Sequence, residues 1–246
     1  MVDVMASLNF GSQSIDYTIK KGKRKRTVAI QVISPSQVVV LTPHSLSREK
    51  VEEIVRKRSQ WILQKQERLR NLARLYPARE FVSGDRLLYL GRRYALKVSR
   101  AENGAQGRPA IEGRRIVVSV GGEGRACPDK NIVREALLKW YLSEADQVIR
   151  RRVELYSKLL DAIPMEILVK EQRRRWGSCS SQGILRFNWQ LIMAPLSITD
   201  YVVVHELCHL RVKNHSPDFW RLVSRALPDY RQRRKWLRDS SPLLKF

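Results

Sequence analysis

The sequence predicts an α+β fold in which most strands precede most helices. Segments that alternate apolar and polar residues lie mainly before residue 121, whereas helical spacing of apolar residues dominates after residue 128. With 246 residues, 43% of them hydrophobic, the chain can bury a sizeable core. We therefore expect a β-rich N-terminal region with one helix over residues 1–122 and a second domain over residues 123–246, with a soft boundary near residues 121–125.

The N-terminal region begins with strands and continues into a helix. Alternating residues predict strands at positions 15–19, 27–32 and 38–41. A basic segment, residues 20–26, forms the expected tip between the first two strands. A helix is expected over residues 45–72, because Ser47 is a suitable N-cap and apolar residues then recur at helical spacing.

The remaining elements follow from the same two periodicities. Further strands are expected at residues 87–90, 94–98 and 115–120. A long helix is expected from residue 128 to about residue 160, and a strand pair over residues 166–193. Two last helices, at residues 197–210 and 216–237, are separated by a short break. Ser197 is the candidate N-cap of the first, with Asp200 at the third position as in a capping box.

The charge of the chain is unusual. Lys and Arg number 47 against 24 Asp and Glu, which gives a net charge of +23. Basic runs occur at residues 20–26, 150–152, 173–175 and 231–235. Either this is a well-solvated basic surface, or several runs share a face that binds DNA or RNA with little sequence preference.

Membrane and secretory features are not expected. The sequence has no apolar stretch of about 18 residues, the length that a spanning helix needs. Its first residues do not combine a charged start with an apolar block, as a secretory signal would. Three widely spaced cysteines form no disulfide framework, which indicates a reducing compartment and a cytoplasmic location.

Three of the four histidines lie within eleven residues and form a candidate metal site. His205 and His209 are spaced i, i+4, which places both imidazoles on one face of a helix. Glu206 points about 100° away from that face, beside the metal and not among its ligands. This is the position of a base that acts on metal-activated water, so Glu206 is the candidate catalytic residue.

His215 is the expected third ligand. On a continuous helix it would lie about 15 Å from His205, so the chain must turn, and Asn214 is a suitable left-handed C-cap. A new helix then starts with Ser216 as N-cap and Pro217 at its first position. Two carboxylates, Asp218 and Asp229, are rival third ligands, and Cys208 reads as a small core residue.

A hairpin upstream of the histidines supplies candidate substrate-binding residues. The polar stretch 175–180 and the alternating stretch 184–188 flank a turn. One interpretation is that one strand offers its edge to a substrate peptide. The candidate residues are Arg175, Trp176, Gly177, Ser178 and Asn188. In the other interpretation Trp176 and Trp189 are core aromatics, and the basic residues 173–175 form a solvated rim.

Several of these motifs together resemble the YgjP-like metallopeptidase family. The resemblance rests on the sequence at residues 201–210, 214–220, 175–180, 185–189 and 90–94, in the expected order, and it extends from about residue 17 onward. It implies a zincin-like catalytic part with an active-site HExxH helix over residues 123–246, and distant similarity to SprT-like proteases. It also implies zinc ligands at His205, His209 and His215 and a catalytic Glu206. The metzincin spacing also matches, but Val212 replaces that group's glycine.

The expected function is therefore zinc-dependent hydrolysis of peptide bonds in a peptide or protein, by Glu-assisted attack of zinc-bound water. The alternative is a basic nucleic-acid-binding protein whose metal site is structural. A third interpretation combines both, as a peptidase that acts on nucleic-acid-bound proteins. Three protein ligands favour an open, catalytic site, because structural zinc sites normally have four.

Overall fold

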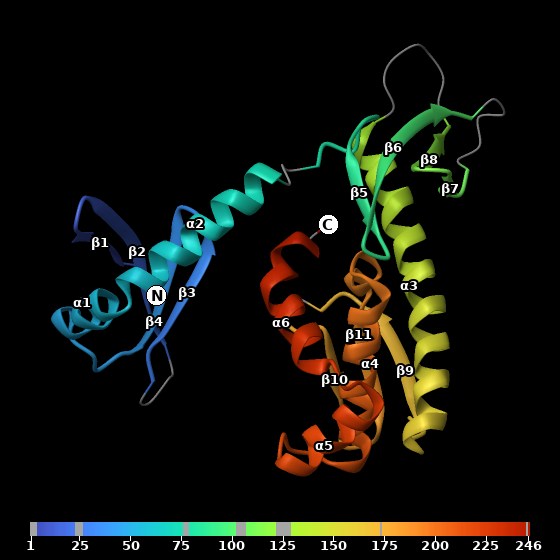
Figure 1. The fold of residues 1–246 in the computed structure, drawn as a ribbon. Coiled ribbons are helices and arrows are strands. Elements are labelled where there is room, and N and C mark those ends of the chain that lie inside the picture. Colours follow the sequence, from blue (N-terminus) through green and yellow to red (C-terminus); the bar gives the residue numbers. More distant parts are fainter. Residues whose placement is uncertain are drawn as a thin grey trace. The chain divides into compact units, whose positions relative to one another are not determined.

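The computed structural model describes residues 4–22, 27–75, 79–101, 107–121, 129–172, 174–244 and 246, and Figure 1 shows the fold. The chain divides into two compact units, Met1–Ala78 and Arg79–Phe246. Several sheets and, within the described residues, six α-helices make this a mixed α/β protein. None of the helices in the described part of the chain is long and apolar enough to cross a membrane.

The first unit contains a four-stranded sheet with the order β1-β2-β4-β3. Its strands are β1 (Val4–Phe10), β2 (Gln13–Gly22), β3 (Ala29–Ser34) and β4 (Gln37–Pro43). The outer pairs are antiparallel and the central pair β2–β4 is parallel. Ile15, Tyr17 and Ile19, at alternate positions of β2, are buried, so the sheet presents one apolar face. The expected hairpin tip at residues 20–26 required the strands on either side of it, β2 and β3, to pair with each other. That prediction was wrong, because both strands pair with β4 instead, and residues 23–26 of the tip lie outside the described residues.

Two helices complete the first core, where the sequence predicted one. Helix α1 (Arg48–Lys57) ends at Arg58, and α2 (Ser59–Leu75) begins directly after it. Ser47 caps α1 as expected, since its hydroxyl accepts from the backbone N–H of Lys50 at 3.5 Å. The break has a local cause: the buried Ser59 hydroxyl donates to the Val55 carbonyl, and such bonds bend helices.

The second unit begins with a sheet that repeats the topology of the first. Its order is β5-β6-β8-β7, again with antiparallel outer pairs and a parallel central pair. The strands are β5 (Arg86–Tyr89), β6 (Arg92–Arg100), β7 (Ala110–Glu112) and β8 (Arg115–Val120). The two units therefore share one strand order, although the sequence shows no internal repeat.

A long helix joins this sheet to the rest of the second unit. Helix α3 (Lys130–Leu160) confirms the expected element, and Asp129 caps it by accepting from the Asn131 N–H at 2.8 Å. One continuous core runs from Leu87 of β5 through α3 to the C-terminal helices. The expected boundary near 121–125 lies largely outside the described residues. The division of the chain into compact units falls between residues 78 and 79, and within the second unit β5 to β8 share this core with α3.

The turn between β5 and β6 is anchored close to the start of the histidine-bearing helix. The short helix η1 (Trp189–Met193) accepts backbone hydrogen bonds from Leu90 at 2.7 Å and from Gly91 at 3.2 Å. Gly91 has φ +78°, and an added Cβ would lie 2.8 Å from Pro195 Cγ. Only glycine fits this close approach without strain.

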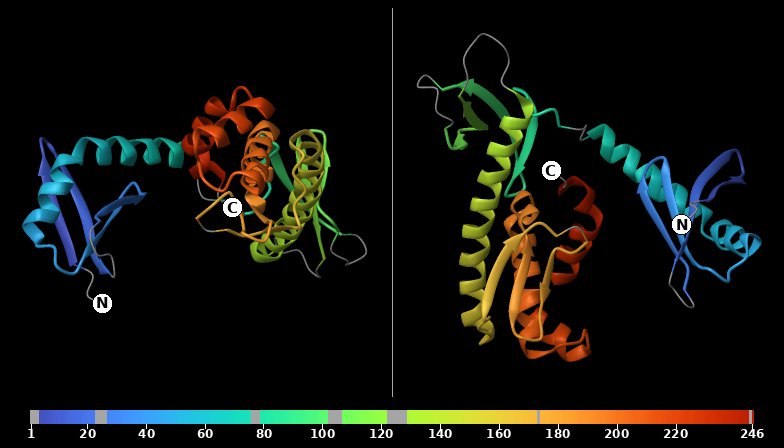
Figure 2. Two further views of the ribbon diagram at one scale, coloured as in Figure 1. Left: turned by 90° about the horizontal axis from the view of Figure 1, so that it is seen from below. Right: turned by 180° about the vertical axis from the view of Figure 1, so that it is seen from behind.

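A three-stranded sheet and three helices form the remainder. The elements are β9 (Glu166–Lys170), β10 (Gly177–Cys179), β11 (Ile184–Asn188), α4 (Leu196–Arg211), α5 (Pro217–Ala226), α6 (Tyr230–Ser240) and the short η2 (Ser241–Leu244). The expected hairpin is β10–β11, and β9 adds in parallel to β11. Figures 1 and 2 both show α4 between α3 and α6, and the backbone contacts agree.

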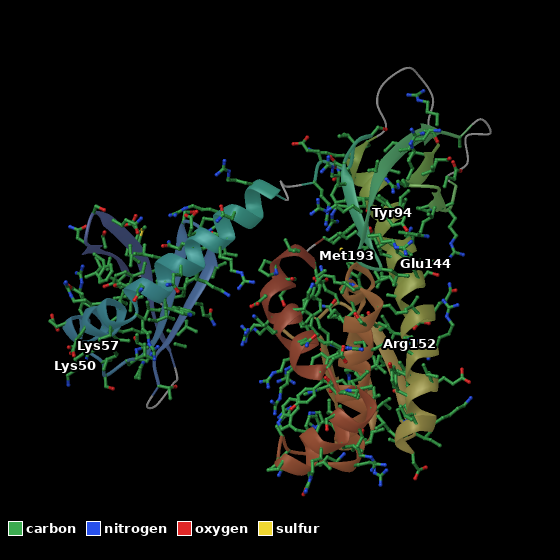
Figure 3. The ribbon with its side chains drawn as sticks, viewed as in Figure 1. Lys50, Lys57, Tyr94, Glu144, Arg152 and Met193 are labelled. Carbon is green, nitrogen blue, oxygen red and sulfur yellow. The ribbon has the colours of Figure 1, made fainter. Side chains whose placement is uncertain are left out.

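An ion pair holds α4 against α3. Arg152, labelled in Figure 3, donates to the two carboxylate oxygens of Asp200 at 2.5 and 3.0 Å. Asp200 was expected to complete a capping box with Ser197 as N-cap. That prediction was wrong, because the N-cap is Pro195 without a side-chain cap bond, and Asp200 instead faces Arg152. Such a bidentate pair fixes orientation as well as distance.

Candidate metal centre

The three clustered histidines come together in the structure. Helix α4 carries His205 and His209 one turn apart, and the chain leaves α4 at Val212, so that His215 precedes α5 and returns to them. Their ligand atoms all lie within 4.8 Å of one another. Among the described residues, this is the one group of three or more His, Cys, Asp or Glu side chains that could hold a metal ion.

The spacing of the ring nitrogens suits a tetrahedral cation. Nε2 of His205 and Nε2 of His215 are 3.1 Å apart. Two nitrogens bound to one tetrahedral zinc at about 2.0–2.1 Å would be roughly 3.3 Å apart. The donor set and its spacing therefore fit zinc.

The outer nitrogen of His209 is already oriented. Its Nδ1 lies 3.1 Å from the carbonyl oxygen of Val212, the residue at which α4 ends. Donation from Nδ1 to this carbonyl leaves Nε2 as the unprotonated nitrogen that a metal requires. His205 differs, because its Nδ1 is buried and has no hydrogen-bond partner.

Burial and mutual repulsion keep the helix-borne histidines neutral. The pKa of His205 is lowered to about 3, first by burial and then by His209, His215 and Arg234. Burial also lowers the pKa of His209, an effect that its bond to the Val212 carbonyl opposes. Neutral imidazole is the form that ligates metal, so no proton has to be removed at neutral pH.

One phenylalanine packs against all three imidazoles. Phe219, fully buried on α5, lies 5.0 Å from His205, 4.5 Å from His209 and 4.8 Å from His215 between ring centroids. Trp220 stacks on His215 at 5.7 Å. These contacts restrict the rings before any metal binds. Neither Phe219 nor Trp220 is among the site residues that the sequence predicts. Phe219 and Trp220 follow His215 by four and five residues, and this short spacing is the sequence signal that could have placed them near it.

Glu206 lies beside the triad in a buried position. Its side chain is on the α4 face that packs against β10, and only 6% of the residue is exposed. Burial raises its pKa to about 7, while the positive charge of Arg175 opposes that rise. The carboxyl group is therefore in the range where it can exchange a proton near neutral pH.

Gly177 on β10 makes room for this carboxyl group. A Cβ added there would lie 2.7 Å from both Cγ and Oε1 of Glu206. The sequence placed Gly177 among the substrate-binding candidates, whereas the structure gives it this spatial role.

We expect Gly177→Ala to lower peptide hydrolysis by at least about tenfold. The new methyl group must displace the Glu206 carboxyl group by a fraction of an ångström. Small misplacements of reacting groups lower reaction rates by up to about 100-fold. Turnover of a fluorogenic peptide by the zinc-loaded protein measures the effect. The matched control is Gly22→Ala, at the end of β2 in the first unit, where no heavy atom lies within 4 Å of the added carbon and the backbone is not left-handed. Unchanged turnover in Gly177→Ala would contradict this interpretation.

The other hairpin candidates divide into two groups. Arg175 is exposed and acts electrostatically on Glu206, and Ser178 is partly buried on β10. Trp176 packs against the core and donates from Nε1 to the Ser241 hydroxyl at 3.1 Å. Asn188 is buried, and its amide bonds to the Gln172 carbonyl and the Gln190 N–H. Trp189 is a core aromatic, 3% exposed.

The chain around His215 differs in detail from expectation. Ser216 is the N-cap of α5 and Pro217 follows it, as predicted. The left-handed cap expected at Asn214 is absent from this described stretch, since α4 ends in extended backbone at Val212. Instead the Asn214 side-chain oxygen accepts from the Ser216 N–H at 3.3 Å.

The rival ligands are engaged elsewhere. Asp218 pairs with Arg221, and Asp229 pairs with Arg233 at 2.9 Å. Cys208 is fully buried in the core, and burial raises the pKa of its thiol to about 12, which fits the small core residue that was expected.

The basic runs have varied surroundings. Arg150 pairs with Asp146 and Arg152 with Asp200, so this run holds the fold together. Arg173 lies outside the described residues. The run at 231–235 lies on α6 and lines a cavity beside Trp220. Nucleic-acid binding through a face shared by at least two of these runs stays a prediction.

Comparisons with known proteins bear on the family of the chain. No curated protein sequence matches the chain. One solved structure that it resembles is described as the crystal structure of the metallopeptidase zymogen of Pyrococcus abyssi abylysin, 18% identical, with 39% of this chain and 96% of that chain covered at a TM-score of 0.35. The family model described as "YgjP-like, metallopeptidase domain" matches residues 26–240. The resemblance seen in the sequence is thereby confirmed, and the chain belongs to the YgjP-like metallopeptidase family.

Proposed function

We propose that this protein is a zinc-dependent metallopeptidase with a zincin-like site, in which His205, His209 and His215 hold the metal. The observation that carries the proposal is the convergence of the three imidazoles within 4.8 Å beside a buried glutamate. Three protein ligands leave a coordination position open, which favours a catalytic role over a purely structural one. Membership of a metallopeptidase family supports the same reaction class.

The protein's own groups have separate roles in this reaction. Zinc, when bound, supplies a Lewis acid that polarises the scissile carbonyl and lowers the pKa of water. Glu206 takes the proton of the attacking water and passes it to the departing amine nitrogen. Its burial and its raised pKa, near 7, support both steps, since the group has to gain and lose a proton in each turnover.

The peptide is proposed to lie along β10. This strand is terminal in the order β10-β11-β9, so one of its edges pairs with β11 and no described strand pairs with the other. An extended peptide can add to such an edge through backbone hydrogen bonds. Gly177 on β10 lies against Glu206, so a peptide on this edge passes close to the base. Arg175 and Ser178 flank the same position.

Metal removal tests the proposal. Protein treated with a chelator and desalted should lose hydrolysis of an unfolded test protein, and one molar equivalent of zinc should restore it. Circular dichroism before and after chelation shows whether the fold persists. Full activity in protein shown by elemental analysis to be free of metal would contradict the proposed mechanism.

A further inference from the structure

A strongly basic cavity adjoins the histidine cluster. It has a volume of about 450 Å³ and is formed by α6 and the aromatic residues beside it. Its lining comprises Trp220, Tyr230, Arg231, Arg234, Lys235 and Arg238. The lining thus contains four cations and, in this described part of the chain, no carboxylate.

The four cations occupy one face of a single helix. Positions 231, 234, 235 and 238 follow the spacing i, i+3, i+4, i+7, which places their side chains on one side of α6. Like charges at this spacing repel one another and destabilise a helix. Of these four, Arg238 has a carboxylate neighbour, Asp239, at 3.5 Å.

Charges on the other helices are arranged differently. Helix α1 pairs Glu52 with Arg56 and Glu53 with Lys57, each at i, i+4. Helix α3 likewise pairs Asp146 with Arg150 and Glu154 with Lys158. The cationic face of α6 therefore differs from α1 and α3, on which opposite charges pair at i, i+4. An anionic ligand would relieve the repulsion among the cations of α6.

Trp220 connects this cavity to the histidine cluster. Its ring lies 5.7 Å from His215 and 6.0 Å from His205, and the Arg234 guanidinium lies over it at 5.0 Å. A strand advances about 3.3 Å per residue. An extended peptide cleaved at the histidines would thus bring a residue within about three positions of the scissile bond to the cavity.

We propose that this cavity is a subsite for an acidic side chain, Asp or Glu, of the peptide substrate, recognised chiefly by Arg234 and Lys235. The inference rests on the proposed peptidase function and names its preferred substrate class. Carboxylates form charge-assisted hydrogen bonds with guanidinium and ammonium groups. The cavity has room for such a side chain.

A nucleobase fits the cavity less well. Binding of single strands relies on exposed aromatic faces for stacking. Trp220 is stacked against Tyr230 at 5.2 Å and an interplanar angle of 16°, and it also contacts His215 and Arg234. Tyr230 is itself 9% exposed. Recognition through charge is thus favoured over recognition through stacking.

Two labelled peptides test the proposal. They share a central Ala-Leu bond and differ only at the positions that flank it, where one peptide has Glu and the other has Gln. Binding is measured by anisotropy with the zinc-loaded full chain carrying Glu206→Gln, and hydrolysis with the zinc-loaded parent. We expect the Glu peptide to bind roughly tenfold more tightly. Adding Arg234→Gln and Lys235→Gln should reduce this preference to about twofold or less.

The control removes the same charge elsewhere in the unit, as Lys139→Gln with Arg225→Gln, and should retain the preference. Arg231→Gln with Arg238→Gln gives a second, independent test of the cavity and should also reduce it. Equal binding of the two peptides, or a preference that survives Arg234→Gln with Lys235→Gln, would overturn the subsite.

A labelled single-stranded oligonucleotide is titrated in parallel. If the cavity variants weaken oligonucleotide binding while the two peptides bind alike, the subsite proposal is overturned and the cavity belongs to nucleic acid. A Glu preference without hydrolysis of either peptide supports the subsite and contradicts the peptidase function. Hydrolysis of both peptides at equal rates, together with equal binding, contradicts the subsite and supports the peptidase function.

Discussion

Replacing Glu206 by Gln should abolish most peptide hydrolysis while leaving zinc binding intact. The amide has nearly the same shape as the carboxyl group but cannot accept and return the proton. Loss of a general base costs about 10²–10⁴-fold, and we expect kcat/KM to fall by at least this factor. A fluorogenic peptide reports turnover, and elemental analysis reports the metal content of the same preparation.

The variant should also fold at least as well as the parent. Burial raises the pKa of Glu206 above that of an unfolded glutamate, so the metal-free parent loses stability as pH rises through about 7. The neutral amide avoids this loss, so metal-free Glu206→Gln should be the more stable protein at pH 8 in denaturant unfolding. Exposed Glu135, on α3, gives the matched control Glu135→Gln, which should keep parental turnover. Parental hydrolysis rates in Glu206→Gln would refute its proposed role, and loss of zinc would make Glu206 a ligand.

The candidate site could be predicted because its signals are local. The i, i+4 spacing of His205 and His209 specifies a shared helix face from sequence alone. Ser216 followed by Pro217 specifies a new helix start, and this forces the turn that returns His215. These relations span at most eleven residues, so no knowledge of the tertiary fold was needed.

Features that depend on distant residues could not be predicted in this way. Nothing near Gly177 reveals that its missing side chain accommodates Glu206, 29 positions later, since β10 meets α4 only in the folded chain. The parallel pairs β2–β4, β6–β8 and β9–β11 likewise join strands that are not neighbours in sequence. Alternation identifies a strand but not its partner.

The α4 start shows how tertiary contacts displace a local signal. Ser197 and Asp200 have the spacing of a capping box, yet the helix begins at Leu196. The Asp200 carboxylate gains a bidentate partner in Arg152, 48 residues earlier in the chain. This partly buried, bidentate, charge-assisted pair outweighs a cap worth about 1 kcal/mol.

Replacing His209 by Ala should abolish stoichiometric zinc binding. His209 supplies one of three proposed protein ligands, and its ring is oriented by the Val212 carbonyl and by stacking on Phe219. Altering a group that only orients a ligand costs about 10–100-fold in metal affinity, so loss of the ligand itself should cost more. Zinc content after desalting and competition with a chelating dye measure the change.

The matched control is His44→Ala, which removes the one histidine outside the cluster from an exposed position in the first unit. It should keep one zinc per chain. His215→Ala should weaken binding less than His209→Ala, because His215 is exposed and precedes a helix, so water can enter its position. Full zinc occupancy in His209→Ala would remove the basis for the metal site. Equal loss in His209→Ala and His215→Ala would instead show that the exposed ligand is as indispensable as the one fixed on α4.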